Sequence, residues 1–263
     1  MTEVSGISYA ESGTGGIPAL CLHGIGGDTE SFRPQLDGLR SDRRMIAWNM
    51  PGYGGSDLLS ETTFEALSDA AIRLMDGLAI DRVHLIGQSI GGMIAQEAAI
   101  RYPDRFASLV LIGTTPAFGG RDDSFKTAFL DARLKPLDAG TPMADLAVRF
   151  VPEIVGPIAQ PEAIEAGTRS MQTVPESTYR AILKCLVTFN RRDDLGLITQ
   201  PVCLIAGSHD RNAPARTMQK MAERLPDAVY HEIDGAGHLI NLEAPEACNR
   251  IIRDFLSAKE EMS

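Results

Sequence analysis

Six short and almost wholly apolar runs recur along the chain, at residues 19–22, 45–48, 83–86, 108–112, 202–206 and 229–233. Most of these runs have too few polar side chains for either face of a strand to lie against water. Strands of this kind belong to mostly parallel sheets that helices cover on both sides. The sequence therefore predicts an α/β fold in which helices flank a mostly parallel central sheet.

Helical patterns fill much of the chain between these runs. Apolar residues recur every three or four positions at 64–78, 90–102 and 245–255. From about 115 to 197 the alternation stops, because helical patterns follow one another without a convincing strand. We therefore expect one core domain built from residues 1–114 and 198–263, with residues 115–197 as a helical cap. The apolar side chains of the cap would line a pocket or pack the cap onto itself.

Acidic side chains outnumber basic ones. The 263 residues carry 35 Asp and Glu against 25 Lys and Arg, a formal net charge of −10. This charge repels nucleic-acid phosphates and acidic membrane surfaces, which favours a small-molecule substrate as the partner. Residues 1–16 do not resemble a signal peptide, and no run approaches ~18 apolar residues. We therefore expect a cytoplasmic protein that does not enter a membrane, whereas the oligomeric state stays open.

The apolar run at 83–86 leads through Gly87-Gln88-Ser89-Ile90-Gly91 directly into a helical pattern. This G-x-S-x-G motif is typical of a sharp turn between a strand and a helix that carries a nucleophilic serine. The two glycines allow the strand and the helix to approach closely, while the amino end of the helix favours negative charge. The motif predicts that Ser89 is a nucleophile whose Oγ projects above the edge of the sheet.

A serine hydroxyl needs a base to accept its proton, and the usual base is an imidazole that a carboxylate orients. His84 and His231 lie within strand patterns, where we expect them to be packed and hydrogen-bonded. His238 instead lies in a glycine-rich loop after the last run and before the last helical pattern, so it is the predicted base. Asp210 follows the run at 202–206 and gives the chain order Ser, Asp, His. Asp234 is its rival, and we favour Asp210 because Asp234 lies only four residues before His238.

Acyl transfer also needs backbone donors for the developing oxyanion, each contributing ~2.7–4 kcal/mol. The N–H of Ile90 follows the nucleophile, and the N–H of Ile25 lies in the glycine-rich turn at 22–27. The alternative for this turn is a phosphate-binding loop, but the sequence lacks G-K-[ST] and does not complete G-x-G-x-x-G. No group of His, Cys and Asp has the spacing of metal ligands, so we expect neither a metal nor an organic cofactor.

Segments with these motifs resemble the α/β-hydrolase superfamily, and they lie at residues 23–26, 49–56, 87–92, 207–210 and 237–238. The resemblance covers almost the whole chain outside the expected cap, and it implies the α/β-hydrolase fold with the cap inserted after strand 6. Within the superfamily the chain is most similar to small carboxylic-ester and enol-lactone hydrolases, including the 3-oxoadipate enol-lactonase group. That narrower similarity rests on overall layout and on residues 133–140 of the cap.

Three departures narrow what the resemblance implies. Ser89 stands where epoxide hydrolases and haloalkane dehalogenases have Asp, so those reactions are not expected. Leu239 stands where many carbon–carbon bond hydrolases have Trp, so cleavage of a carbon–carbon bond is less expected than cleavage of an ester. Asn49 stands where relatives often have Asp, and we interpret it as a structural position near the rim of the site.

The resemblance and the motifs together imply a serine hydrolase that cleaves a small ester or enol-lactone through an acyl-enzyme. The alternatives are a carbon–carbon bond hydrolase or lyase that uses the same triad, and a ligand receptor that turns over little. The helical pattern around Arg133 carries apolar neighbours, including Phe129, and this suggests that it faces a pocket. Arg133 would then bind a substrate carboxylate, although such an arginine also fits a solvated face.

Overall fold

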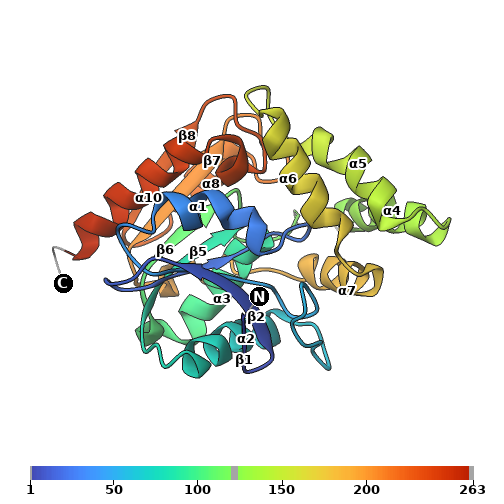
Figure 1. Cartoon of the computed structure of the whole chain (residues 1–263). Coiled ribbons are helices and arrows are strands. Elements are labelled where there is room, and N and C mark those ends of the chain that lie inside the picture. Colours follow the sequence, from blue (N-terminus) through green and yellow to red (C-terminus); the bar gives the residue numbers. More distant parts are fainter. Residues whose placement is uncertain (1, 120–123, 261–263) are drawn as a thin grey trace.

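The computed structural model describes residues 2–119 and 124–260, and its centre is an eight-stranded sheet (Figure 1). The strands are β1 (Thr2–Val4), β2 (Ile7–Ser12), β3 (Ala19–Leu22), β4 (Met45–Trp48), β5 (Val83–Gln88), β6 (Phe106–Ile112), β7 (Val202–Gly207) and β8 (Ala228–Ile233). Their order is β1-β2-β4-β3-β5-β6-β7-β8. The six strands from β3 to β8 run parallel, whereas β1 and β2 are antiparallel to their neighbours. The predicted α/β fold with a mostly parallel sheet is confirmed.

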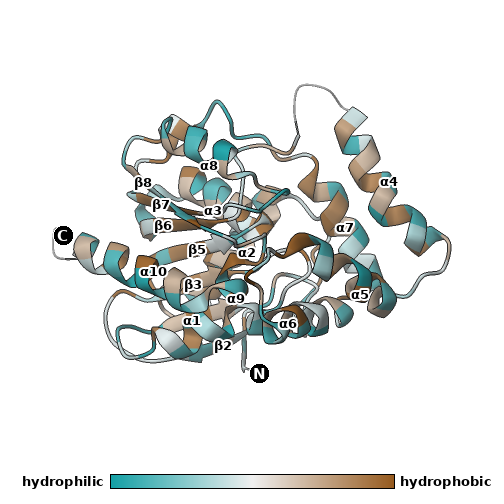
Figure 2. Cartoon of the chain, turned by 90° about the horizontal axis from the view of Figure 1, so that it is seen from above, coloured by the Kyte–Doolittle hydropathy of each residue, from teal (hydrophilic) through white to brown (hydrophobic). Residues whose placement is uncertain are grey.

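Buried side chains alternate between the two faces of the sheet. In β6, Leu109 and Leu111 join one apolar cluster, while Val110 and Ile112 join the other. The first cluster includes residues of α2 (Phe64–Gly77), α3 (Ile90–Arg101) and α8 (Ala215–Ala222). The second includes residues of α1 (Arg33–Gly38), α9 (Ile240–Glu243) and α10 (Pro245–Glu260). Figure 2 shows this layering, with apolar residues at the centre of the sheet and both colours on α10.

Four longer helices lie between β6 and β7 in the chain. They are α4 (Ser124–Asp138), α5 (Met143–Ile154), α6 (Pro161–Gln172) and α7 (Glu176–Leu186). In Figure 1 they gather on one side of the sheet. Short 3-10 helices at Thr29–Phe32, Pro103–Arg105 and Leu195–Leu197 complete the elements. Residues 120–123 of the expected cap lie outside the described residues, and the division into core and cap stays a prediction.

Two features of the sheet differ from what we expected. β1 and β2 form an antiparallel hairpin at one edge, where no strand is expected from the sequence. His231 is exposed on β8, so the expectation that it packs within the sheet is wrong. β8 is an edge strand, and most of its side chains are therefore only partly covered.

Among the described helices, none has the length and apolarity needed to cross a bilayer.

Candidate active site

Ser89 lies in the sharp turn between β5 and α3. Its φ of 55° and ψ of −122° are a backbone conformation that residues with a Cβ rarely adopt. A Cβ on Gly87 would overlap the backbone of Gly91, and a Cβ on Gly91 would overlap the carbonyl oxygen of Leu22. Both glycines therefore permit the close approach of strand and helix that places Ser89 at the end of the sheet.

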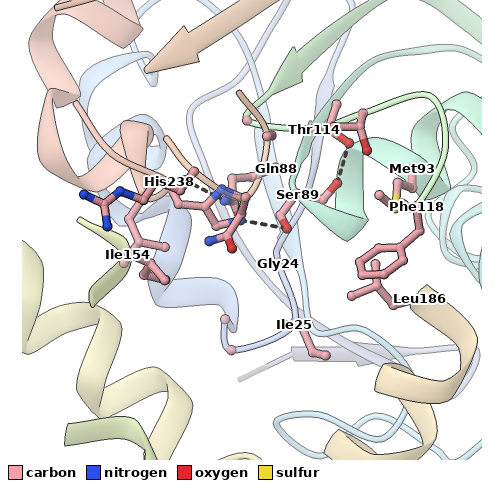
Figure 3. Close-up of a pocket in the computed structure, with 18 of the residues that line it drawn as sticks. Gly24, Ile25, Gln88, Ser89, Met93, Thr114, Phe118, Ile154, Leu186 and His238 are labelled. Carbon is pink, nitrogen blue, oxygen red and sulfur yellow. Dashed lines mark hydrogen bonds between the residues drawn. The ribbon is translucent and has the colours of Figure 1, made fainter. Parts of the chain in front are cut away.

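Three side chains from distant parts of the chain form one hydrogen-bonded row, and Figure 3 shows two of them, Ser89 and His238. The Oγ of Ser89 lies 3.0 Å from Nε2 of His238, and Nδ1 of His238 lies 2.8 Å from Oδ2 of Asp210. Asp210 follows β7, and its other oxygen accepts from the N–H groups of Asn212 and Ala213 at 2.8 and 3.0 Å. Since an ionised carboxylate only accepts, Nδ1 of His238 donates to Asp210, and Nε2 is left to accept from Ser89.

The charges of this row shift two pKa values in opposite directions. Burial disfavours the imidazolium of His238, but the adjacent Asp210 outweighs burial and raises the pKa of His238 above its ordinary value. Burial likewise disfavours the carboxylate of Asp210, but His238 and the two backbone donors lower the pKa of Asp210. Asp210 is therefore held as the anion, and His238 is made a stronger base.

The rival acid and two other histidines lie apart from this row. Asp234 is exposed and accepts a hydrogen bond from Ser208 at 3.0 Å instead of reaching His238. His84 is buried, with its Nδ1 2.8 Å from the Oγ of Ser108, as expected of a packed histidine. His209 is exposed. Of the two candidate acids, only Asp210 meets His238.

The two predicted oxyanion donors flank Ser89. The N–H of Ile90 is the first of α3, and the turn that contains Ile25 lines the same cavity as Ser89 (Figure 3). Within the described residues, no acceptor is recorded for either N–H group. The Oη of Tyr53 donates to the carbonyl oxygen of Ile25 at 2.8 Å and so fixes this turn. Both groups are thus free to bind an oxyanion.

His23 and Asn49 hold the backbone in and next to this turn. Nδ1 of His23 donates to the carbonyl of Gly24 at 2.7 Å, and Nε2 accepts from the N–H of Met50 at 2.9 Å. Burial lowers the pKa of His23 to about 4, so the ring is neutral. The Oδ1 of Asn49 accepts from the N–H of Thr29 at 3.1 Å. Both side chains hold backbone segments together, which agrees with a structural role for Asn49.

A cavity of about 400 Å³ opens over Ser89. Met93, Phe118 and Leu186 gather on the side of Ser89 away from His238 and Ile154 (Figure 3). Among the described lining residues, two are arginines and none is acidic, although the whole chain carries a net charge of −10. Across the described part of the chain, no cluster of His, Cys, Asp or Glu is suited to hold a metal ion.

Arg133 and Phe129, both on α4, line this cavity as predicted from the sequence. The guanidinium carbon of Arg133 lies 3.6 Å from the ring centroid of Phe129 and 5.1 Å from that of Phe150. Burial lowers the pKa of Arg133 below its ordinary value. No described carboxylate forms an ion pair with it, and one long hydrogen bond joins Nη1 to the carbonyl of Phe129 at 3.4 Å.

Three supporting residues were not identified from the sequence. Nε2 of Gln88 donates to the carbonyl of His238 at 2.9 Å, and Oγ1 of Thr114 donates to the carbonyl of Ser89 at 2.7 Å. Glu243 is buried beside the His238 loop and accepts three backbone hydrogen bonds. An acidic residue within the short apolar stretch after His238 was the one available signal for Glu243.

Comparisons with known proteins agree with this fold. A family model described as "alpha/beta hydrolase fold" matches residues 18–245. The chain is 30% identical over 252 residues to the protein named "Putative carbamate hydrolase RutD" of Variovorax paradoxus, covering 92% of each. It is 25% identical to 3-oxoadipate enol-lactonase 1 of Acinetobacter baylyi, covering 96% of this chain and 93% of that one. The structure of a thermophilic esterase from Thermogutta terrifontis, with malate bound, superimposes with a TM-score of 0.86 at 25% identity, covering 96% and 93%.

Proposed function

This chain belongs to the alpha/beta hydrolase fold family, and we propose that it is a serine hydrolase that cleaves a small carboxylic ester or lactone through an acyl-enzyme. The observation that carries the proposal is the hydrogen-bonded row of Ser89, His238 and Asp210, whose first two members line the cavity. The names of its relatives, a carbamate hydrolase, an enol-lactonase and an esterase, support hydrolysis of ester-like bonds.

In the first half of the reaction, the Oγ of Ser89 attacks the carbonyl carbon and its proton passes to Nε2 of His238. Asp210 stabilises the imidazolium that forms, because its Oδ2 accepts a hydrogen bond from the Nδ1–H of His238 at 2.8 Å. The N–H groups of Ile25 and Ile90 bind the oxyanion of the tetrahedral intermediate. The intermediate then collapses, the carbon–oxygen bond breaks, and His238 donates the proton to the leaving alcohol.

In the second half, water attacks the acyl carbon of the ester formed on Ser89. Nε2 of His238 accepts a proton from this water, and the same two N–H groups bind the second oxyanion. Collapse releases the carboxylic acid and returns the proton to Oγ of Ser89. A lactone follows the same route, except that the alcohol stays attached to the acyl part until the product leaves.

We further propose that the substrate carries a carboxylate, which Arg133 binds while Phe129 packs against its carbon chain. Arg133 is half-buried, lines the cavity of Ser89 and forms no ion pair with a carboxylate among the described residues. A buried charge is unfavourable unless an opposite charge or hydrogen bonds compensate for its lost hydration. The absence of acidic groups from the described lining favours an anionic substrate for the same reason.

The direct test compares the wild-type protein with Ser89→Ala in the hydrolysis of short-chain p-nitrophenyl esters and enol-lactones. The wild type should hydrolyse them and the variant should lose turnover by about 10⁶-fold, as expected when a nucleophile is removed. Circular dichroism of both proteins controls for folding. Absence of ester and lactone hydrolysis by the folded wild type would refute the proposal. Turnover of ketones or cyanohydrins would then indicate carbon–carbon chemistry, and tight ligand binding without turnover would indicate a receptor.

A further inference from the structure

Glu243 is a buried carboxylate that the reaction itself does not use. It lies at the end of α9 with 5% of its surface exposed. Its Oε2 accepts from the N–H groups of Gly237 and Gly156, each at 2.7 Å, and its Oε1 accepts from the N–H of Leu239 at 2.8 Å. These three hydrogen bonds compensate for the burial of its charge.

Two of the three donors belong to the immediate neighbours of His238 in the chain. Gly237 precedes His238 and Leu239 follows it, so one carboxylate holds the loop on both sides of the imidazole. The backbone groups of His238 itself are bonded to other residues. Its N–H donates to the carbonyl of Ile154 at 2.7 Å, and its carbonyl accepts from Gln88 at 2.9 Å. The position of the ring therefore depends on the backbone that Glu243 fixes.

The third donor comes from another part of the chain. Gly156 follows α5, and a Cβ on it would overlap the carbonyl oxygen of Gly235 in the His238 loop. A Cβ on Gly237 would in turn overlap the N–H nitrogen of Gly156. The two loops therefore meet backbone to backbone, and the Oε2 of Glu243 lies at their junction.

We propose that Glu243 is a positioning residue, whose carboxylate keeps the His238 imidazole within reach of Ser89 by joining the His238 loop to the segment after α5. This inference rests on the proposed function, because it assigns a role in the reaction of the same site. Correct placement of the base matters because misplacement of ~1 Å can lower the rate by about a hundredfold.

The charge of Glu243 also acts on His238. Among the described residues, three charged groups act on the imidazole: Asp210 from the loop after β7, Glu243 from α9 and Arg133 from α4. Asp210 and Glu243 raise the pKa of His238, whereas Arg133 lowers it. Loss of the Glu243 charge should therefore move the titration of His238 to lower pH, which a purely structural role in the loop would not do.

The test is Glu243→Gln, because glutamine keeps the size but offers one acceptor oxygen, and its NH₂ faces an N–H donor. We expect kcat for ester hydrolysis to fall by about tenfold to a hundredfold with little change in KM. The acid limb of the kcat/KM profile, and the NMR titration of His238, should both move to lower pH. Glu246→Gln is the matched control, because Glu246 is exposed on α10 and its loss removes the same charge.

A kcat of Glu243→Gln within twofold of the wild-type value would overturn the inference. So would a titration of His238 in this variant that coincides with that in the wild type. If Glu243→Gln does not fold, Glu243→Asp decides, because it keeps the charge but shortens the reach. It should lower kcat while leaving the acid limb in place, and an unchanged kcat would overturn the inference. The NMR titration needs no substrate, so it tests Glu243 even if the wild type fails to hydrolyse esters and the proposed function falls.

Discussion

The guanidinium of Arg133 is compensated only in part by its surroundings. Phe129 and Phe150 supply cation–π contacts, which contribute ~0.5–2 kcal/mol each. The single recorded hydrogen bond is long, and most of the N–H groups of the fork remain without an acceptor among the described residues. A planar fork of this kind matches the two oxygens of a carboxylate. Its position in the cavity of Ser89 is the basis of the proposal that the substrate carries a carboxylate.

Replacement of Arg133 by Ala should raise KM for acidic esters by about tenfold to a hundredfold, because a hydrogen bond to a charged group contributes ~1.5–3 kcal/mol. KM for neutral esters of similar size should change by less than about threefold, because only packing on Phe129 is lost. Steady-state kinetics with matched acidic and neutral p-nitrophenyl esters measures both.

Arg149 is the control for this prediction. It lies on α5, is exposed, and removal of its side chain takes the same charge away from the same group of helices. Arg149→Ala should leave KM unchanged for both kinds of ester. Equal effects of Arg133→Ala on acidic and neutral esters would refute carboxylate binding.

The residues that the structure brings together were predictable to different degrees. Ser89 was predictable because its motif is local, and Asp210 and His238 because both follow strands that end at the same edge of the sheet. Glu243 was not, since its three donors come from two loops about 80 residues apart in the chain. Such a contact depends on how helices pack and leaves no spacing pattern in the sequence.

At the level of elements, the turn from β5 to α3 combines function with local strain. Ser89 has a positive φ of 55°, which costs ~1–3 kcal/mol for a residue with a Cβ. Neighbouring contacts hold it in place: its N–H donates to the carbonyl of Ile112 at 2.9 Å, and its carbonyl accepts from Thr114 at 2.7 Å. The strain is therefore a property of the element that positions the proposed nucleophile.

Two inactive variants should separate this strain from the lost hydroxyl. Ser89→Ala keeps the Cβ, whereas Ser89→Gly removes it and allows the positive φ without strain. After the greater flexibility of unfolded glycine is counted, Ser89→Gly should be more stable than Ser89→Ala by about 1 kcal/mol. Urea denaturation at equilibrium measures the difference in the free energy of unfolding.

Ser257 provides the opposite case. It is exposed within α10, where glycine is less favourable than alanine by ~0.5–1 kcal/mol. Ser257→Gly should therefore be less stable than Ser257→Ala. If Ser89→Gly were also less stable than Ser89→Ala, the turn at Ser89 would not be strained.

Strands that read as apolar runs were predicted, including β8 at one edge of the sheet, whereas β1 and β2 at the other edge were not. β5, β6 and β7 are buried on both faces and read as apolar runs. β1 and β2 mix polar and apolar residues, because one is exposed and the other half covered. Ser5 and Gly6 between them both have positive φ, and this Ser-Gly pair was the turn signal for a hairpin.

On the scale of the whole molecule, two segments connect the sheet with α4–α7, one after β6 and one before β7. We call these two segments the passages. The two passages pair with each other, since the N–H of Phe118 donates to Phe189 at 2.9 Å and the N–H of Arg191 donates to Pro116 at 2.8 Å. Arg191 also forms a two-point ion pair with Glu97 of α3, at 2.6 and 2.8 Å. This pair joins both passages to the helix that begins after Ser89.

The final prediction concerns this ion pair. Glu97 is 1% exposed, so loss of Arg191 leaves a buried charge without its main partner. Breaking a fully buried pair costs ~3–5 kcal/mol, and the partial exposure of Arg191 reduces this to about 2–3 kcal/mol for Arg191→Met. The double variant with Glu97→Gln should recover part of the loss in the free energy of unfolding, because no charge is then buried.

The control is Arg33→Ala, which breaks an exposed pair with Asp37 and should change the free energy of unfolding by less than about 0.5 kcal/mol. Urea denaturation of the four proteins measures these differences, and equal losses for Arg191→Met and Arg33→Ala would mean that the pair does not hold the two passages against α3.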